Sequence, residues 1–231
     1  MYPVVYFRLT KKPKVVFETK NGFKIIIRTE PKSTDIHVFT AIWLENIYTA
    51  PTSGTVIDIG SHIGIFCLYA LQYCDRVFCF EPDTNNFNLL VENLDKNKAA
   101  NVFVFKQACS SKTGRMQFYL SDHDLAAHNL YKKNTESVQE VKTITLEDIF
   151  NQNKIESCDF LKMNCEAAEY DIILNSSDNC LKKIRKISIQ YHEGPINDLI
   201  KKLQDFNFYV QTRPTSNTAG FLYATASHID S

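Results

Sequence analysis

Two carboxylates and a group of glycines stand where a parallel sheet would place the polar groups of a ligand site. The run TVIDIGSHIG (residues 55–64) begins with apolar and β-branched residues and ends in Asp58, Gly60 and Gly64. A strand that passes through a glycine turn into the N-terminus of a helix forms a nucleotide-sized site in α/β folds. Gly60 can relieve the tight strand exit, and the amides of Ser61 and His62 would face a ligand. An ordinary strand-to-helix turn is the alternative interpretation.

Glu81 adds a second polar group at the end of the next predicted strand, RVFCF (residues 76–80), where Pro82 stops the strand. It follows 21 residues after Gly60, and an acidic residue about 20 residues on can accept hydrogen bonds from ribose hydroxyls. Together with the glycine turn it predicts an adenosine-type ligand. The glycine spacing is GxxxG and not GxGxxG, which disfavours a nicotinamide oxidoreductase.

Four motifs in this order resemble the FkbM family of S-adenosylmethionine-dependent methyltransferases. They are VIDIGSHIG (56–64), FEPD (80–83), TLED (145–148) and KMNCEAAEYDIIL (162–174), and the resemblance extends from about residue 35 to about 212. It implies a class I methyltransferase (Rossmann-like) three-layer α/β sandwich, whose seven-stranded sheet is mostly parallel with the last strand antiparallel. It also implies S-adenosyl-L-methionine as cofactor and methyl transfer to a hydroxyl oxygen.

Carried over residue by residue, the resemblance implies that Asp58 and Gly60 lie against the methionine part of the cofactor. Glu81 would then hold the ribose, Gln107 and Ala108 would neighbour the adenine, and Glu166 would face the transferred methyl group. The full set expected to bind the cofactor is Asp58, Gly60, Ser61, His62, Gly64, Glu81, Pro82, Gln107, Ala108 and Asn164.

The chain departs from the family pattern at the end where the chemistry is expected. Asn164 replaces an Asp, Gln190 replaces a Glu, and His62 stands where the family has Asn. An amide can orient a substrate, but it cannot act as a general base. We therefore expect Glu166, His192 and Asn164 to be the catalytic residues, with His192 as base because its ordinary pKa is about 6.5. A histidine bonded to the backbone at a strand end is the alternative for His192, and a scaffolding or cofactor-binding subunit that has lost the reaction is the alternative function.

The expected acceptor is a small molecule or a glycan. Lys and Arg total 26 and Asp and Glu total 26, so the basic excess of a nucleic-acid binder is missing. An NPPY-like tetrapeptide, usual in methyltransferases that act on nucleic-acid nitrogens, is missing after the fourth strand. The polar segment 121–137 predicts a long loop, and four side chains at it are candidates for the acceptor pocket: Tyr119, His123, His128 and Tyr131. The oligomeric state is left open.

The alternation of strands and helices after residue 51 predicts the organisation of the chain. We expect residues 1–50 to form N-terminal strands and a helix, with strands at 4–9, 14–18 and 23–27 and a helix over 35–47, packed on a methyltransferase domain of residues 51–231. Seven cysteines without a CxxC pair predict reduced thiols and a cytoplasmic protein. Apolar runs are too short for a membrane helix, and the histidines lack zinc-ligand spacing, so neither membrane insertion nor a bound metal is expected.

Overall fold

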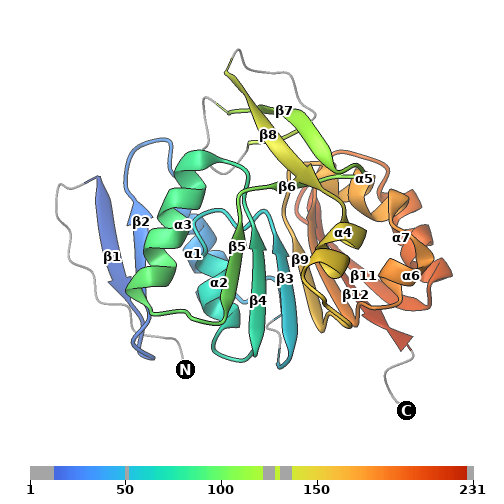
Figure 1. Cartoon of the computed structure of the whole chain (residues 1–231), viewed down its shortest axis with the longest axis horizontal. Helices are drawn as coiled ribbons and strands as arrows, with labels where there is room; N and C mark the ends of the chain where they lie inside the picture. Colours follow the sequence, from blue (N-terminus) through green and yellow to red (C-terminus); the bar gives the residue numbers. More distant parts are fainter. Residues whose placement is uncertain (1–12, 50–51, 122–127, 131–136, 228–231) are drawn as a thin grey trace.

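The computed structural model describes residues 13–49, 52–121, 128–130 and 137–227. Figure 1 shows a central twisted sheet flanked by helices on both faces, with the N-terminal strands beside one edge. The strands of the central sheet, in spatial order, are β11 (Phe208–Pro214), β12 (Gly220–Ala226), β10 (Lys186–Tyr191), β9 (Phe160–Met163), β3 (Thr55–Ile59), β4 (Arg76–Phe80) and β5 (Val102–Phe105). The last strand, β12, runs antiparallel to both of its neighbours, and the pairs β10–β9, β9–β3, β3–β4 and β4–β5 are parallel.

The inner strands are apolar along their whole length because helices cover both faces of the sheet. All five residues of β3 are buried, and alternate side chains point to opposite faces. Val56 joins the core cluster shared with α2 and α3, whereas Ile57 and Ile59 join the cluster shared with α4 to α7. The helices are α1 (Asp35–Phe39), η1 (Thr40–Leu44, a π-helix), α2 (Ile65–Ala70), α3 (Thr84–Lys96), α4 (Leu146–Gln152), α5 (Ala168–Asn175), α6 (Asp178–Leu181) and α7 (Ile196–Asp205).

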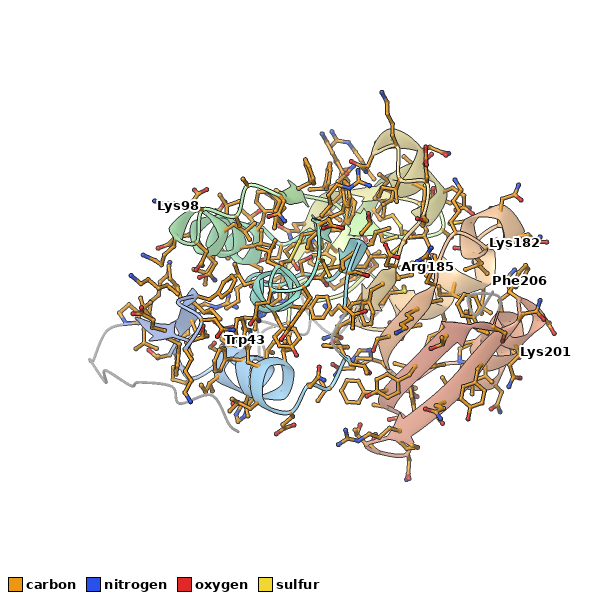
Figure 2. The ribbon with its side chains drawn as sticks, turned by 90° about the horizontal axis from the view of Figure 1, so that it is seen from below. Trp43, Lys98, Lys182, Arg185, Lys201 and Phe206 are labelled. Atoms are coloured by element: carbon orange, nitrogen blue, oxygen red, sulfur yellow. A yellow bond between two sulfur atoms is a disulfide. The ribbon has the colours of Figure 1, made fainter. Side chains whose placement is uncertain are left out.

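Two smaller sheets complete the fold. β1 (Lys14–Glu18) and β2 (Lys24–Arg28) form an antiparallel hairpin, and β6 (Ala108–Cys109), β8 (Val138–Ile144) and β7 (Gly114–Tyr119) form a three-stranded sheet in that order. The hairpin packs on the core through buried Phe17 and Ile25, which share a cluster with residues of α2 and α3. Trp43 of η1 stacks on Phe39, and Figure 2 shows it far from Lys182 and Lys201 at the opposite end of the molecule.

The expected strands and helices agree closely with the described elements. The segment predicted as one helix over 35–47 is helical only from Asp35 to Leu44. Its first part, Asp35–Phe39, is α-helical and its second part, Thr40–Leu44, is π-helical. The two-residue strand β6 and the single-turn helix α6 were not predicted, since segments that short have no readable period. The strand predicted at 4–9 lies outside the described residues, as does most of the loop 121–137. Among the described residues, no helix is long and apolar enough to cross a membrane.

The prediction that all cysteines are reduced is wrong for one pair, because a disulfide joins Cys67 of α2 to Cys79 of β4. Helix α2 packs on the face of the sheet to which Cys79 points, so residues 12 apart in sequence meet without a CxxC motif. Five described cysteines are free: Cys74, Cys109, Cys158, Cys165 and Cys180.

Candidate active site

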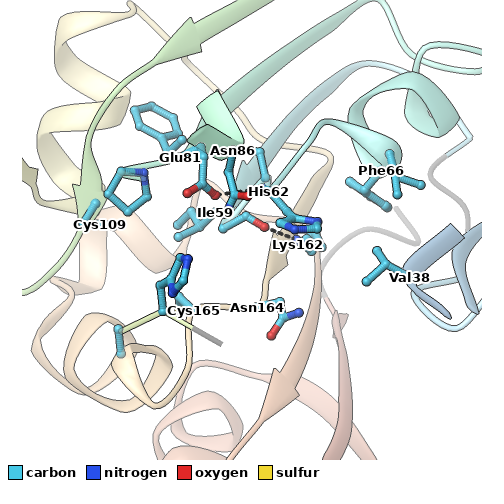
Figure 3. Close-up of a pocket in the computed structure, with 18 of the residues that line it drawn as sticks. Val38, Ile59, His62, Phe66, Glu81, Asn86, Cys109, Lys162, Asn164 and Cys165 are labelled. Carbon is cyan, nitrogen blue, oxygen red and sulfur yellow. Dashed lines mark hydrogen bonds between the residues drawn. The ribbon is translucent and has the colours of Figure 1, made fainter. Parts of the chain in front are cut away.

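A cavity opens where β3, β4 and β9 end, at the carboxyl edge of the sheet, as the rule for parallel sheets requires. Figure 3 shows Glu81, His62, Lys162 and Asn164 around it, with Val38 and Phe66 on one wall. The lining includes the predicted residues Gly60, Ser61, His62, Glu81, Pro82, Ala108 and Asn164. Residues more than a hundred positions apart thus meet at one place.

The β3–α2 turn depends on glycine at position 60. Gly60 has a φ of +74°, and a Cβ added there would lie 1.9 Å from the carbonyl oxygen of Asn164. The amides of Gly60 and Ser61 both donate to the carbonyl of Phe80, at 3.0 and 3.1 Å. Gly64 does not line the cavity but has a φ of +84°, and a Cβ added there would lie 3.2 Å from the Cγ of Leu90. The turn is therefore held between β4 and β9 with no room for a side chain at Gly60.

Asp58 forms a buried ion pair with Lys162, which the sequence analysis did not select. The Lys162 Nζ lies 2.8 Å from Asp58 Oδ1 and donates to the carbonyl of Gly60 at 2.7 Å. It also lies over the rings of Tyr48 and Phe66, 5.4 and 5.8 Å from their centroids. A lysine inside an otherwise apolar strand was the available signal, because a buried ammonium must find a partner. Lys162 lines the cavity, whereas Asp58 lies behind it.

Glu81 is held by the backbone on both of its oxygens. Its Oε2 accepts from the amide of His62 at 2.8 Å, and its Oε1 accepts from the amide of Asp83 at 2.9 Å. Burial raises the pKa of Glu81 to about 8, against the effect of these two amides. Further hydrogen-bond donors would stabilise the charged form of Glu81, because each carboxylate oxygen still has a lone pair that can accept from a hydroxyl.

The wall beyond Glu81 is mostly apolar. Ala108 and Cys109 of β6 line the cavity together with Phe118 of β7. Gln107, expected beside the adenine, does not line it, and its amide donates to Phe105 at 2.9 Å. The next residue, Ala108, faces the cavity.

Of the loop candidates, His128 lines the cavity, where its Nδ1 accepts from the amide of Ser121 at 2.8 Å. Tyr119 is buried and donates to Gln117 instead. His123 and Tyr131 lie outside the described residues.

Two of the residues that depart from the family pattern are connected through Tyr48. The Tyr48 hydroxyl donates to Gln190 Oε1 at 3.1 Å and receives a side-chain hydrogen bond from Asn164. Burial raises the pKa of Tyr48 well above its ordinary value, so the hydroxyl keeps its proton. Asn164 lines the cavity beside Lys162. The two amides therefore belong to one neutral network at the ends of β9 and β10.

His192 lies between two glutamates, Glu166 and Glu169, and pairs with both. His192 Nε2 lies 3.2 Å from Glu166 Oε1, and its Nδ1 lies 3.1 Å from Oε1 of the fully buried Glu169. Burial lowers the pKa of His192, but the hydrogen bonds and charges of the two glutamates outweigh it and raise the pKa to about 10. An imidazolium cannot accept a proton, so the raised pKa argues against the role of general base near neutrality that was predicted for His192 from its ordinary pKa. Neither Glu166 nor His192 lines the cavity.

The pairing of His192 with two glutamates should make the stability of the folded protein depend on pH in the alkaline range. Because the pKa of His192 is about 10 in the folded state and 6.5 ordinarily, its stabilisation is complete below pH 6.5 and is lost as the pH rises through 10. We expect the free energy of unfolding to fall over this window by on the order of 3 kcal/mol more in the wild type than in His192→Gln. Urea denaturation from pH 6 to pH 10 measures this, with His37→Gln, at an exposed position of α1, as control. If the free energy of unfolding depends on pH equally in the wild type and in His192→Gln, the pairing of His192 with the two glutamates does not stabilise the fold.

The donors that could hold a metal ion among the described residues are already engaged. Asp58, Cys67 and Cys79 offer ligand atoms within 4.8 Å of one another. The two sulfurs are bonded to each other, and the carboxylate is paired with Lys162. The arrangement is that of a disulfide beside an ion pair.

The sheet order, with an antiparallel last strand and a cavity over the carboxyl ends of β3, β4 and β9, defines the class I methyltransferase fold. Residues 58–210, about two thirds of the chain, match the methyltransferase FkbM domain. The chain belongs to the FkbM methyltransferase family.

Curated relatives include two methyltransferases. The chain is 28% identical over 138 residues to hexuronic acid methyltransferase AglP of Haloferax volcanii, covering 59% of this chain and 55% of that protein. It is 28% identical over 184 residues to 2-O-methyltransferase NoeI of Sinorhizobium fredii, covering 68% of this chain and 73% of that protein. The chain thus spans about half the length of AglP.

Among solved structures, the methyltransferase FkbM of Methylobacillus flagellatus aligns with a TM-score of 0.53 and 17% identity. The alignment covers 80% of this chain and 47% of that one. This similarity supports the fold.

Proposed function

We propose that the protein uses S-adenosyl-L-methionine to methylate a hydroxyl group of a sugar, a glycan or another small molecule. The observation that supports this best is the single cavity that joins buried Glu81 at one end to Lys162 and Asn164 at the other. The first end suits a ribose and the second suits the polar end of an amino acid. When bound, the cofactor supplies an activated sulfonium methyl group.

The residues at the first end fit the nucleoside of this cofactor. Glu81 would accept hydrogen bonds from the ribose hydroxyls, as the acidic residue after the second strand does in related sheets. Pro82, Ala108 and Cys109 provide an apolar slot of the kind that binds a flat base. Gly60 lines the cavity with backbone atoms alone, because the Asn164 carbonyl fills the position that a Cβ would take.

The residues at the second end fit the amino-acid part and the acceptor. The Lys162 ammonium is the cation of the cavity wall and would attract the cofactor carboxylate. Asn164 would orient the acceptor, with its side chain restrained by Tyr48. With His192 protonated and Asn164 an amide, these groups contribute by positioning, which can supply much of the rate of a transfer from an activated donor.

Calorimetry with S-adenosylhomocysteine tests the cofactor. At pH 9, where the Glu81 carboxylate is ionised, we expect micromolar binding by the wild type and a 10- to 100-fold loss of affinity in Glu81→Gln, because a hydrogen bond to a charged group contributes about 1.5–3 kcal/mol. Glu92→Gln, at an exposed glutamate of α3, is the matched control and should bind like the wild type. No heat with the wild type, or equal affinity in Glu81→Gln, would refute this assignment.

The acceptor is tested with methyl-labelled cofactor and a panel of uronic acids and neutral sugars. A hydroxyl acceptor gives a methyl ether that survives mild alkali, whereas methylation of a carboxylate gives an ester that alkali removes. Label that is stable to alkali supports the proposal, and alkali-labile label would replace it with carboxyl methylation. Binding without any transfer across the panel would favour the cofactor-binding subunit, the alternative that Asn164 and Gln190 suggested.

A further inference from the structure

Arg28, the last residue of β2, reaches from the N-terminal hairpin to the wall of the cavity. It precedes the residues that match the family domain, yet its side chain is only 8% exposed. Its partner Asp35, the first residue of α1, is completely buried. A buried arginine must have partners for its charge and for its hydrogen-bond donors.

Arg28 and Asp35 form a forked ion pair. The Nε and Nη2 atoms of Arg28 donate to Oδ2 and Oδ1 of Asp35 at 3.0 and 2.8 Å, and the Arg28 amide donates to Oδ2 at 2.8 Å. Burial by itself would raise the pKa of Asp35, but the hydrogen bonds from Arg28 and the electrostatic interactions with His62 and Arg28 hold it below its ordinary value. The carboxylate is therefore ionised and fixes the plane of the guanidinium.

The remaining donors of Arg28 point to two side chains that line the cavity. Nη1 donates to Asn86 Oδ1 at 2.9 Å, and Nη2 lies 2.7 Å from His62 Nε2. Arginine can only donate, so His62 Nε2 accepts and the ring carries its proton on Nδ1. The 3.4 Å separation between His62 Nε2 and Asp35 Oδ1 is consequently a contact of two acceptors that share one guanidinium.

His62 connects this network to Glu81. The His62 amide donates to Glu81 Oε2 at 2.8 Å while the residue adopts a φ of +53°. A left-handed conformation costs a residue with a side chain roughly 1–2 kcal/mol, so it persists where other contacts hold it. The bond to Arg28 is such a contact, and the resulting backbone conformation aims an amide at the carboxylate.

We infer that Arg28 and Asp35 are positioning residues of the cofactor site. They hold His62 and Asn86 in place and thereby keep Glu81 oriented for the ribose. This inference rests on the proposed function, and it makes the N-terminal segment part of the functional unit.

The test compares the double variant Arg28→Gln/Asp35→Asn with the wild type. Both replacements are neutral and similar in shape, so no buried charge is left without its partner. We expect the dissociation constant for S-adenosylhomocysteine to rise at least tenfold. Lys14→Gln, which removes an exposed ion pair of the same hairpin, should change it less than twofold. Nitrogen-15 histidine NMR should show the Nδ1–H tautomer of His62 in the wild type and its loss in the double variant.

The outcomes separate this inference from the proposed function. A wild type that does not bind S-adenosylhomocysteine refutes the proposed function. A wild type that binds, with unchanged affinity and unchanged His62 tautomer in the folded double variant, overturns the inference. Should the double variant not fold, His62→Gln keeps the Arg28–Asp35 pair and removes only the imidazole. It is expected to weaken binding about tenfold, and wild-type affinity in it would overturn the inference as well.

Discussion

Gly60→Ala is expected to destabilise the folded protein by about 3 kcal/mol or more and to abolish cofactor binding. The new Cβ would lie 1.9 Å from the Asn164 carbonyl, where backbone atoms must move. Neither side can yield easily, since the Gly60 amide is bonded to Phe80 and the Asn164 amide to Ile59. The positive φ of +74° adds a strain of roughly 1–2 kcal/mol. Urea denaturation and calorimetry with S-adenosylhomocysteine measure the two effects.

Gly22→Ala is the matched control for this substitution. Gly22 has a φ of +82°, similar to that of Gly60, but no atom lies within 4 Å of its added Cβ. It should therefore show the strain alone, about 1 kcal/mol, and bind the cofactor normally. If both alanine variants lose the same stability, the close approach of β9 to the turn is not what requires glycine.

Lys162→Met is expected to cost about 3–5 kcal/mol, because it leaves the Asp58 carboxylate buried without its cation. Asp58→Asn/Lys162→Met should recover much of that stability, since no buried charge remains, but it should not recover cofactor affinity. Thermal and urea unfolding of the three proteins measure the first effect, and calorimetry measures the second.

The exposed pair between Lys14 and Glu92 provides the comparison for Lys162. Its members are about half exposed, so Lys14→Met should change stability by less than about 1 kcal/mol. A double variant that binds the cofactor as tightly as the wild type would show that Lys162 acts only on stability.

Much of the fold was readable from the sequence because its signals are local. The apolar strands β3, β4 and β9 are followed directly by Gly60, Glu81 and Asn164, and parallel strands align such ends at one edge of the sheet. The side of the cavity expected to hold the cofactor was therefore predictable in outline. Of the two residues predicted beside the adenine, Ala108 lines the wall and Gln107 does not, whereas Cys109, which was not predicted, does. These differences depend on one residue of strand register.

The electrostatic state of the site was not predictable, because it depends on which groups meet across long sequence separations. His192 was predicted to act as the general base from its ordinary pKa. Glu166 and Glu169 lie on both sides of it and raise its pKa, which keeps it protonated. Arg28 lies 34 residues from His62, and no motif connects them. The Cys67–Cys79 disulfide likewise follows from the packing of α2 on β4.

The sequence by itself determined the order of strands and helices, the glycine requirement at the β3–α2 turn and the place of Glu81 at the cavity, since each follows from residue types at short spacing. Only the tertiary structure decided the pairing of Lys162 with Asp58, the protonation of His192 and the contribution of Arg28. Burial sets the charge of a side chain through its neighbours in space, and those neighbours come from distant segments of the chain.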